Sequence, residues 1–316
     1  MPQRPDDLME LLPAAAPFLE RALERADDEP GDRPLVLVHT LSGEFDAARA
    51  GTVTAAHLLA TLPRTDIARF DADSLVDYRA RRPRMTFTGD RYADVDLPEI
   101  VLSALEDDDG QPFLLLHGPE PDFHWRRFVA AVVEVGRRVG VTSLVALHAV
   151  PMPVPHTRPV TLTAHASHRG LIDGYPLYWG EVRIPGSVGA LLELRSGEVG
   201  TDAFGFAAHV PHYLAQATFP AASLTLLDHL GRVTGLRVPT DALEEAAAAN
   251  RTEVDEQIAR SSENTAVVEA LEKQYDEFTA AHGGSGLLGG QAMPSADEIA
   301  GEFERFLAEQ ERRRGD

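Results

Sequence analysis

The chain contains no cysteine and only one lysine among its 316 residues. The absence of cysteine excludes thiol catalysis, disulfides, iron–sulfur clusters and zinc sites built on thiolates. The one lysine, Lys273, falls in a stretch patterned as a surface helix, which argues against a Schiff-base lysine or a phosphate-loop lysine. No apolar run approaches the ~20 residues that a membrane-spanning helix needs, so we expect no membrane span.

Positive charge is also scarce. The 29 basic residues are outnumbered by 50 acidic residues, which gives a net charge of −21. Nucleic acids and anionic lipids bind to clustered cationic side chains, so neither is an expected partner. The first 33 residues lack the cationic start and apolar middle of a secretory signal. With 44% hydrophobic and 25% charged residues the composition is that of a globular protein, and we expect a cytoplasmic one.

What the sequence does contain is an alternation of apolar runs and helical patterns between residues 34 and 239. Runs typical of strands occupy residues 34–39, 66–70, 84–88, 113–117, 143–148, 160–166, 180–184 and 204–209. Apolar residues at helical spacing occupy residues 47–62, 123–139, 187–194 and 220–233. This alternation predicts an α/β domain whose sheet is largely parallel and covered by helices on both faces.

The two ends of the chain differ from this middle part. Residues 1–33 are rich in proline and charge, and are interpreted as a lead-in segment with a short amphipathic helix within residues 8–25. Residues 240–316 hold 18 acidic and 7 basic residues, a net charge of −11, with one apolar stripe at helical spacing. That pattern predicts an acidic helix or helical hairpin that packs on another surface. A glycine-rich linker at residues 283–290 precedes a last helix at residues 296–313.

Candidate functional residues follow the predicted strands. His39, His117 and His148 each end an apolar run. Because ligands bind beyond the carboxyl ends of strands in open α/β sheets, we expect these histidines to line one crevice. Imidazoles and carboxylates together support acid–base chemistry or ligand binding. The acid–base candidates are His39, His117 and Glu120. The ligand-binding candidates are His39, Glu44, His117, Glu120, Asp122, His124 and His148.

A structural interpretation competes with this one. Strand-end histidines often bind backbone carbonyls, and Asp46 and Asp122 stand where helix caps are expected. The loop at residues 118–125 either grips a polar ligand at a helix start or is a proline-shaped turn that buries Trp125. The pairs His165/His168 and His209/His212 lack the glutamate of the helical zinc motif, so no metal site is predicted.

Several common catalytic motifs are absent. The sequence has no Gly-x-Ser-x-Gly elbow, no Gly-x-Gly-x-x-Gly after a strand and no Gly-x-x-x-x-Gly-Lys loop. Esterase, dinucleotide-dependent oxidoreductase and ATPase activities therefore lose support, and we predict no cofactor.

Four segments resemble the proteasome assembly chaperone 2 family, in its bacterial, actinobacterial branch. They are residues 39–51, 117–122, 151–159 and 205–213, within a resemblance that covers residues 34–239. The resemblance implies a three-layer α/β/α sandwich like that of nucleoside phosphorylases and hydrolases, and the pattern after residue 239 adds a C-terminal helical extension. It also implies self-association, as a homotrimer, and proteasome-related or other protein subunits as partners. The chain ends Arg314-Gly315-Asp316 rather than in a hydrophobic–tyrosine–any tail, so insertion of the tail into a proteasome pocket is not expected.

Two hypotheses about function follow. The first is a non-enzymatic, oligomeric protein-binding or assembly-chaperone-like protein. The second is a hydrolase or nucleoside-phosphorylase-like enzyme that uses the strand-end crevice, and a small-ligand sensor would use the same crevice without turnover. Geometry separates them, because His39, His117 and Glu120 must all come within hydrogen-bond reach of one small substrate for the enzyme to work.

Overall fold

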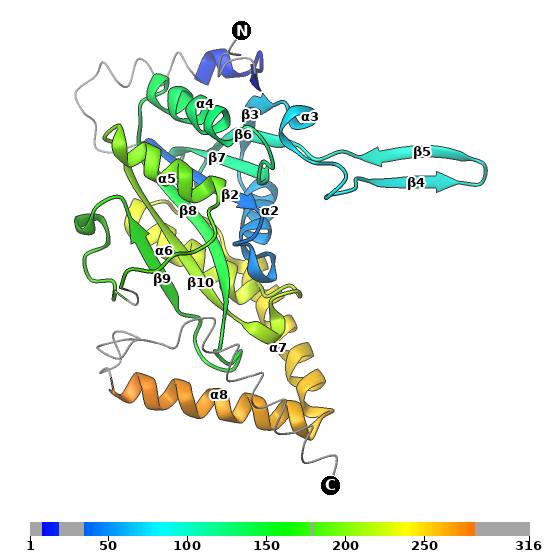
Figure 1. Ribbon diagram of the computed structural model, residues 1–316, viewed down its shortest axis with the longest axis vertical. Coiled ribbons are helices and arrows are strands. Elements are labelled where there is room, and N and C mark those ends of the chain that lie inside the picture. The colour runs from blue at the N-terminus through cyan, green and yellow to red at the C-terminus, as the bar shows by residue number, and fades with distance from the viewer. Residues whose placement is uncertain (1–7, 19–34, 178–179, 282–316) are drawn as a thin grey trace.

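A mixed eight-stranded sheet forms the centre of the computed structural model, which describes residues 8–18, 35–177 and 180–281 (Figure 1). The strand order is β1-β3-β6-β7-β2-β8-β10-β9. In chain order these strands are β1 (Met9–Leu11), β2 (Leu35–Ser42), β3 (Arg64–Phe70), β6 (Ile100–Glu106), β7 (Pro112–Pro119), β8 (Val141–Met152), β9 (Leu162–Ala166) and β10 (Asp202–Pro211). The other two strands, β4 (Arg84–Thr88) and β5 (Arg91–Asp96), pair with each other in a separate two-stranded sheet.

Helices cover both faces of the main sheet. They are α2 (Ala50–Thr61), α3 (Ala72–Leu75), α4 (Trp125–Arg138), α5 (Val188–Glu198), α6 (Pro220–Thr234), α7 (Asp241–Ala259) and α8 (Ser262–Ala281), with short 3₁₀ turns η2 (Ala47–Arg49), η3 (Arg169–Ile172) and η4 (His212–Leu214). None of the helices in the described residues is long and apolar enough to cross a bilayer.

The four central strands are parallel, as predicted, but the sheet as a whole is mixed. β7, β2, β8 and β10 run parallel to one another, whereas the pairs β1–β3, β3–β6, β6–β7 and β10–β9 are antiparallel. The expectation of a largely parallel sheet is therefore wrong outside the centre. One physical reason is the short turn at residues 107–111, which joins β6 directly to β7 and leaves no room for a crossover helix.

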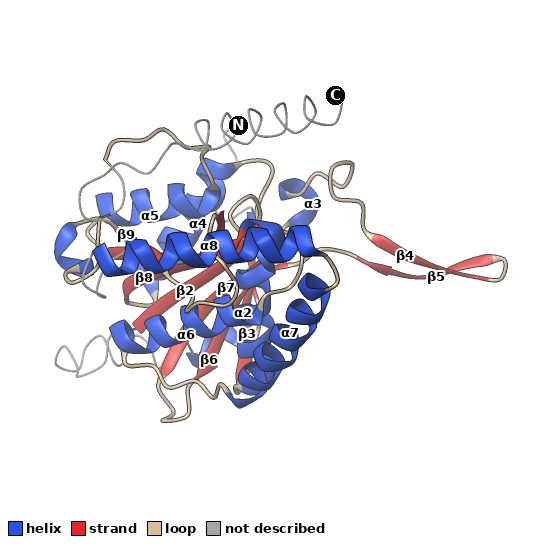
Figure 2. Cartoon of the chain, turned by 90° about the horizontal axis from the view of Figure 1, so that it is seen from below, coloured by secondary structure: helices blue, strands red, loops and turns tan. Residues whose placement is uncertain are grey.

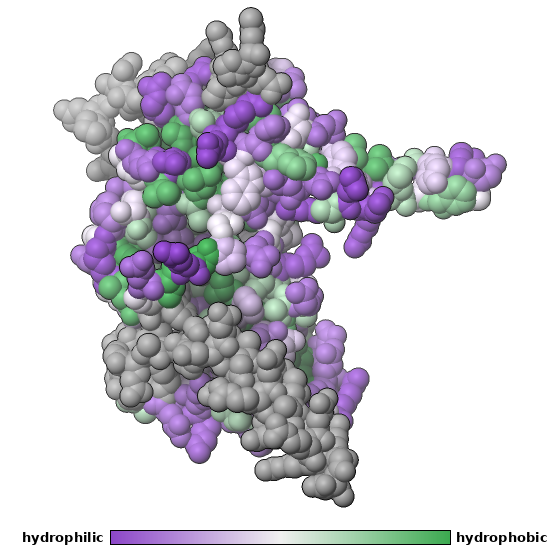
Figure 3. Space-filling view, viewed as in Figure 1, coloured by the Kyte–Doolittle hydropathy of each residue, from purple (hydrophilic) through white to green (hydrophobic). Residues whose placement is uncertain are grey.

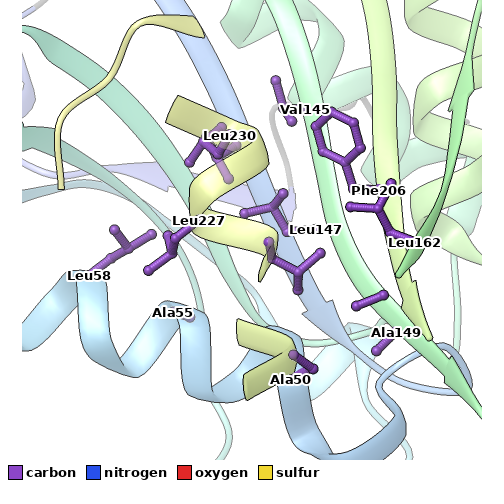
Figure 4. Packing of buried hydrophobic residues seen from close by; sticks show 14 of the residues in the cluster. Ala50, Ala55, Leu58, Val145, Leu147, Ala149, Leu162, Phe206, Leu227 and Leu230 are labelled. Atoms are coloured by element: carbon purple, nitrogen blue, oxygen red, sulfur yellow. The ribbon is translucent and has the colours of Figure 1, made fainter. Parts of the chain in front are cut away.

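Two apolar layers flank the sheet and confirm the three-layer sandwich. One layer joins α2, α6 and α7 to the sheet; in Figure 4, Leu58 of α2 and Leu227 and Leu230 of α6 lie over Leu147 of β8. The other layer holds α4 and α5 on the opposite face, through residues such as Phe128 and Leu192. Because β2 has Val36 and Val38 in the first layer and Leu37 in the second, its continuous apolar run is explained by burial on both sides.

Several predicted elements are displaced or absent. The strand expected at residues 180–184 is irregular chain, and the described residues 9–11, expected in a helix, instead form the edge strand β1. The strand predicted at residues 84–88 exists as β4 but lies outside the main sheet. β5 and β6 were not predicted, although β6 is a buried run, Ile-Val-Leu-Ser-Ala-Leu, bounded by Pro98 and by acidic turn residues.

The acidic residues after 239 form two helices that are joined end to end, α7 and α8. Leu243 and Val254 of α7 enter the same core as α2 and α6, and Figure 2 shows α7 and α8 alongside the body of the molecule. The predicted linker at residues 283–290 and the predicted helix at residues 296–313 lie outside the described residues. The division at residues 33 and 239 stays a prediction.

Candidate functional site

The three strand-end histidines do not face the same side of the sheet. Side chains alternate between the two faces of a strand. His39 of β2 therefore shares the α4–α5 face with Leu37, and His148 of β8 shares it with Leu144. His117 of β7 points to the opposite face, with Leu115. The expectation of one crevice lined by all three histidines is wrong for His117.

His117 belongs to a separate polar chain across β7, β6 and β3. Its Nε2 lies 3.1 Å from Ser103 Oγ, which donates a hydrogen bond to Asp66 Oδ1 at 2.8 Å. Burial lowers the pKa of His117, while the nearby charge of Asp66 acts in the opposite direction. Because Ser103 is fully buried, this chain holds neighbouring strands together and offers no accessible nucleophile.

Glu120 holds the start of α5. Its Oε1 accepts a hydrogen bond from the backbone N–H of Val188 at 2.6 Å, at the first residue of that helix. Its own backbone N–H donates to Ser42 O, and its carbonyl accepts from Arg81 Nη1, both at 2.8 Å. A carboxylate at a helix N-terminus is stabilised by the unpaired N–H groups and by the helix dipole. The buried Glu120 side chain is thus occupied as a helix cap, whereas His117 contacts Ser103.

The remaining candidates near this loop are also placed apart from the histidines. Asp122 was expected to cap α4; instead its carboxylate accepts from the backbone N–H of Asp77 and from Arg81 Nη2, both at 2.7 Å. His124 is exposed and precedes α4 in a left-handed conformation with φ of 58°. Trp125 Nε1 donates to Pro121 O at 2.7 Å, and Glu44 is exposed in the turn after β2. The rigid loop therefore joins elements, which favours the structural interpretation.

The structure does bring His39 and His148 together, with two residues that were not in the candidate set. His165 of β9 stacks on His148, with ring centroids 5.0 Å apart and planes at 24°. His165 Nδ1 lies 2.7 Å from Glu193 Oε2 of α5. We call His39, His148, His165 and Glu193 the imidazole cluster. It draws on three strands, β2, β8 and β9, and on the helix that covers them.

Two glycines make room for this cluster. A Cβ atom on Gly189 of α5 would lie 2.9 Å from His39 Cε1, and one on Gly205 of β10 would lie 2.6 Å from His165 Cε1. Such distances are shorter than real Cβ contacts. The sequence thus has no side chain at the two positions where an imidazole ring meets a neighbouring backbone.

Two histidines of the imidazole cluster, His39 and His148, are held neutral by burial. Burial lowers the pKa of His39 to about 4, against the opposing charge of Glu193. Burial also lowers the pKa of His148 well below its usual range, and the charges of His165 and His39 lower it further. His39 Nε2 and His165 Nε2 are both buried without a hydrogen-bond partner in the described residues. A buried polar atom left unpaired costs about 1–3 kcal/mol, so these two nitrogens destabilise the packed rings unless a small donor such as water reaches them.

The sequence drew attention to His165 only as part of a histidine pair, which suggested a different kind of site. The pair His165/His168 suggested metal binding by two residues three apart, yet His168 is exposed and lies 3.2 Å from Asp202 instead. The second pair is also split, because His209 lies between Thr161 and Thr163 at 2.9 Å from each hydroxyl, while His212 is exposed. In the described part of the chain no three His, Asp or Glu side chains come together to hold a metal ion.

A second polar cluster fastens the C-terminal helices. His156 is buried, with Nδ1 2.6 Å from Tyr213 Oη and Nε2 2.9 Å from Asp255 Oδ1 of α7. The next two residues contact α8, since Thr157 hydrogen-bonds to Glu272 and the Arg158 guanidinium makes two hydrogen bonds to Asp276, at 2.7 and 2.8 Å. Through these contacts, the segment at residues 151–159 anchors α7 and α8 to the body of the protein.

The model of one protein family, described as the PAC2 family, matches residues 40–258 of the chain. The chain belongs to the PAC2 family. Apart from residue 39, the matched part contains the four segments on which the family resemblance was based, so that prediction is confirmed.

Solved structures of PAC2 relatives resemble the chain over most of its length. A protein of unknown function from Mycobacterium tuberculosis is 45% identical, with a TM-score of 0.81, and the match covers 89% of this chain and 94% of that one. A protein of unknown function from Corynebacterium glutamicum is 36% identical, with a TM-score of 0.77 and coverage of 86% and 98%. A second M. tuberculosis protein, described as a proteasome-assembly chaperone homologue, is 27% identical, with a TM-score of 0.68 and coverage of 74% and 100%. No curated protein matches the chain.

Proposed function

We propose that this PAC2 protein is a self-associating protein-binding protein of the assembly-chaperone type, and that the hairpin β4–β5 is its contact arm. The hairpin projects from the body of the molecule (Figure 1). Every residue of its two strands is exposed. The observation that carries the proposal is the apolar face of this arm.

The apolar face follows from the register of the two strands. Met85 is paired with Val95, and after a register shift Phe87 is paired with Tyr92. The Phe87 and Tyr92 rings meet edge to face, with centroids 5.2 Å apart. Thr86 and its partner Asp94 point to the other side, because successive side chains alternate. One side of the arm is therefore apolar and the other polar, and Figure 3 shows both kinds of residue along it.

Such an arm gains stability from a partner. An isolated two-stranded hairpin is marginally stable in water, because it buries little apolar surface. Here Phe87 is 59% exposed and Tyr92 71% exposed, and neither belongs to the hydrophobic cores. Large exposed aromatic side chains on one face are typical of contact surfaces. A second copy of the chain is the partner that we propose first, in the homotrimer that the family resemblance implied.

Family membership supports a protein partner of a second kind. One PAC2 relative is described as a proteasome-assembly chaperone homologue. We propose that proteasome-type subunits, or other protein subunits, bind to the self-associated form of this chain.

Native mass spectrometry and size-exclusion chromatography with light scattering test self-association. The wild-type chain should have the mass of three copies, and the double substitution Phe87→Ser with Tyr92→Ser should give monomers. The matched control, Thr86→Ser with Asp94→Asn, changes the polar side of the same hairpin and should leave the mass unchanged. A wild-type monomer at micromolar concentration would refute the proposal.

The second partner is tested by mixing purified proteasome core subunits with the wild-type chain and with each of the two double variants. Native mass spectrometry then shows which of these proteins form a complex. A complex with the wild-type chain and with the polar-side control supports the proposal. If no subunit forms a complex, proteasome subunits are excluded as partners. Self-association is then judged separately, by the mass of the wild-type chain.

A further inference from the structure

A cluster of basic residues lies at the base of the β4–β5 arm. Arg79, Arg81, Arg82 and Arg84 fall within six consecutive positions, and no acidic residue occurs from position 78 to position 89. This stretch connects α3 to β4, where the arm leaves the body, and hydrophilic residues are visible there in Figure 3. In a chain with a net charge of −21, such a local excess of positive charge points to an acidic partner.

The backbone of the basic stretch is fixed by the body of the protein. Arg81 Nη2 donates to Asp122 Oδ1 at 2.7 Å, and Arg81 Nη1 donates to Glu120 O at 2.8 Å. The backbone N–H of Arg81 donates to Asp77 O, and that of Arg79 donates to Asp77 Oδ1, both at 2.9 Å. A partner that binds here therefore does not have to order this turn first.

The other three guanidinium groups are exposed and free to bind. Among the described residues, none forms an ion pair or a side-chain hydrogen bond with Arg79, Arg82 or Arg84. Exposed arginines elsewhere pair with a carboxylate on their own helix, as Arg232 does with Asp228. Because a guanidinium group presents several N–H donors in a planar fork, three free ones suit a surface of carboxylates.

The chain itself supplies such an acidic surface on α7 and α8. Residues 241–281 hold 11 acidic and 3 basic residues. Four of these carboxylates are exposed and have no partner in the described part of the chain: Asp241, Glu245, Glu263 and Glu269. Val267 of α8 is 45% exposed and lies one turn after Glu263, on the same side of the helix. The surface is thus acidic with an exposed apolar side chain.

A closed ring of three copies needs two different surfaces on each chain. In such a ring a patch on one copy meets another patch on the next copy, whereas a two-fold dimer uses the same patch twice. The arm with its basic stretch is one surface, apolar and positive. The outer side of α7 and α8 complements it, because it is negative and also carries Val267.

We propose that Arg79, Arg82 and Arg84 of one copy bind the exposed carboxylates of α7 and α8 of the next copy. This contact rests on the proposed self-association, and it names the surface that receives the base of the arm. Its charges select which surfaces of two copies meet, while the apolar face of the arm supplies burial.

Charge reversal in the full chain tests the contact. The base variant carries Arg79→Glu, Arg82→Glu and Arg84→Glu, and sedimentation velocity over a range of protein concentrations gives the dissociation constant of the assembly. That constant should rise at least about tenfold, because attraction becomes repulsion across the contact.

A matched control has the same net charge as the base variant. Arg126→Glu, Arg138→Glu and Arg183→Glu reverse three exposed arginines that make no ion pair or side-chain hydrogen bond with other described residues. The control should keep the wild-type dissociation constant. An equal loss in the control would assign the effect to net charge and overturn the proposal.

A compensating variant guards against substitutions that only disturb folding. Adding Glu245→Arg, Glu263→Arg and Glu269→Arg to the base variant exchanges the charges of the two surfaces and restores the wild-type net charge. This combined variant should recover the wild-type dissociation constant, which an unfolded chain cannot do. A combined variant that stays dissociated overturns the proposal.

Salt gives a second readout on the unmodified protein. Between about 0.1 M and about 1 M sodium chloride the screening length falls from about 10 Å to about 3 Å. Association of the wild-type chain should weaken over this range, whereas a contact made by the apolar face of the arm alone would not weaken.

The outcomes separate this contact from self-association itself. A wild-type chain that is monomeric refutes self-association and the contact together. A wild-type assembly whose dissociation constant is the same in the base variant overturns the contact alone, and self-association through the apolar face of the arm then stands.

Discussion

At the scale of single residues, the carboxylate of Glu120 shows how one side chain fixes a helix. Its Oε1 accepts the hydrogen bond of the Val188 N–H, which α5 cannot satisfy within itself. Glu120→Ala should lower the free energy of unfolding by about 1–3 kcal/mol, because a buried donor is left unpaired. Glu120→Gln keeps an acceptor at the same place and should cost less. Urea denaturation measures the free energy of unfolding of both variants. Equal losses would show that the hydrogen bond to Val188 does not determine the stability contributed by Glu120.

His39 makes the stability of the fold depend on pH. Its pKa is about 4 in the folded chain, against an ordinary value of 6.5. The unfolded chain therefore binds the proton more readily between these values, so stability is complete above pH ~6.5 and is lost as the pH falls toward ~4, with no further loss from this group below that. The contribution of His39 is at most about 3 kcal/mol.

The variant His39→Gln isolates this contribution. Its free energy of unfolding should fall less between neutral pH and pH ~4.5 than that of the wild-type chain, because it lacks one buried histidine that must take up a proton. His209, whose pKa burial also lowers to about 4, still titrates in the variant and supplies a remaining slope. Parallel curves for the two proteins, obtained by urea denaturation, would contradict the assignment.

The residues of the imidazole cluster could be predicted only in part. His39 and His148 were found because each follows an apolar run, and position along a strand is visible in sequence. The face of the sheet depends on whether a residue is at an odd or even position, which separates His117 from His39 once the strand register is known. Glu193 was not predicted, because its meeting with His165 depends on how helix α5 lies across β9.

At the scale of elements, the anchor at residues 156–158 holds two helices that bury few apolar residues. His156→Ala removes the two side-chain hydrogen bonds, to Tyr213 and to Asp255 of α7, while the backbone N–H of residue 156 still donates to the Tyr213 hydroxyl. We expect a loss of about 2 kcal/mol or more, and faster amide exchange confined to α7 and α8. Hydrogen exchange by mass spectrometry measures it.

The matched control for this anchor is His168→Ala. It removes an exposed histidine that pairs with Asp202, and exposed pairs contribute little. Exchange in α7 and α8 should stay at the wild-type level. If His156→Ala instead accelerates exchange evenly over the whole sheet, the helices and the body open as one unit and the anchor has no separate role.

Elements that bury residues on both faces were the easiest to predict. The strands β2, β7, β8 and β10 each contain an apolar run, and their positions follow from those runs. β1 was predicted wrongly because three residues carry no periodicity, and their strand state comes from pairing with β3. The direction of β3 and β6 likewise depends on pairing across the sheet, which no local pattern encodes.

At the scale of the whole molecule, the acidic helix α8 meets a basic side chain of the body, Arg158. Arg158 pairs with Glu272 and Asp276 of α8. Those carboxylates raise the pKa of Arg158 further, and the guanidinium lowers that of Asp276. This attraction, together with the burial of Leu243 and Val254 of α7, helps an acidic stretch to pack on a protein that is itself negative.

The hairpin β4–β5 can be removed without touching the cores, which contain none of its residues. Replacing residues 84–96 by a short Gly-Ser turn should therefore leave the protection of the main-sheet amides from hydrogen exchange unchanged. The melting temperature of the wild-type chain should rise with protein concentration, because association stabilises the folded state by mass action, and that dependence should vanish in the excised variant. The control with Thr86→Ser and Asp94→Asn should retain it. A variant that unfolds, or that keeps the concentration dependence, would show that the arm belongs to the fold of a single chain or that another surface joins the copies.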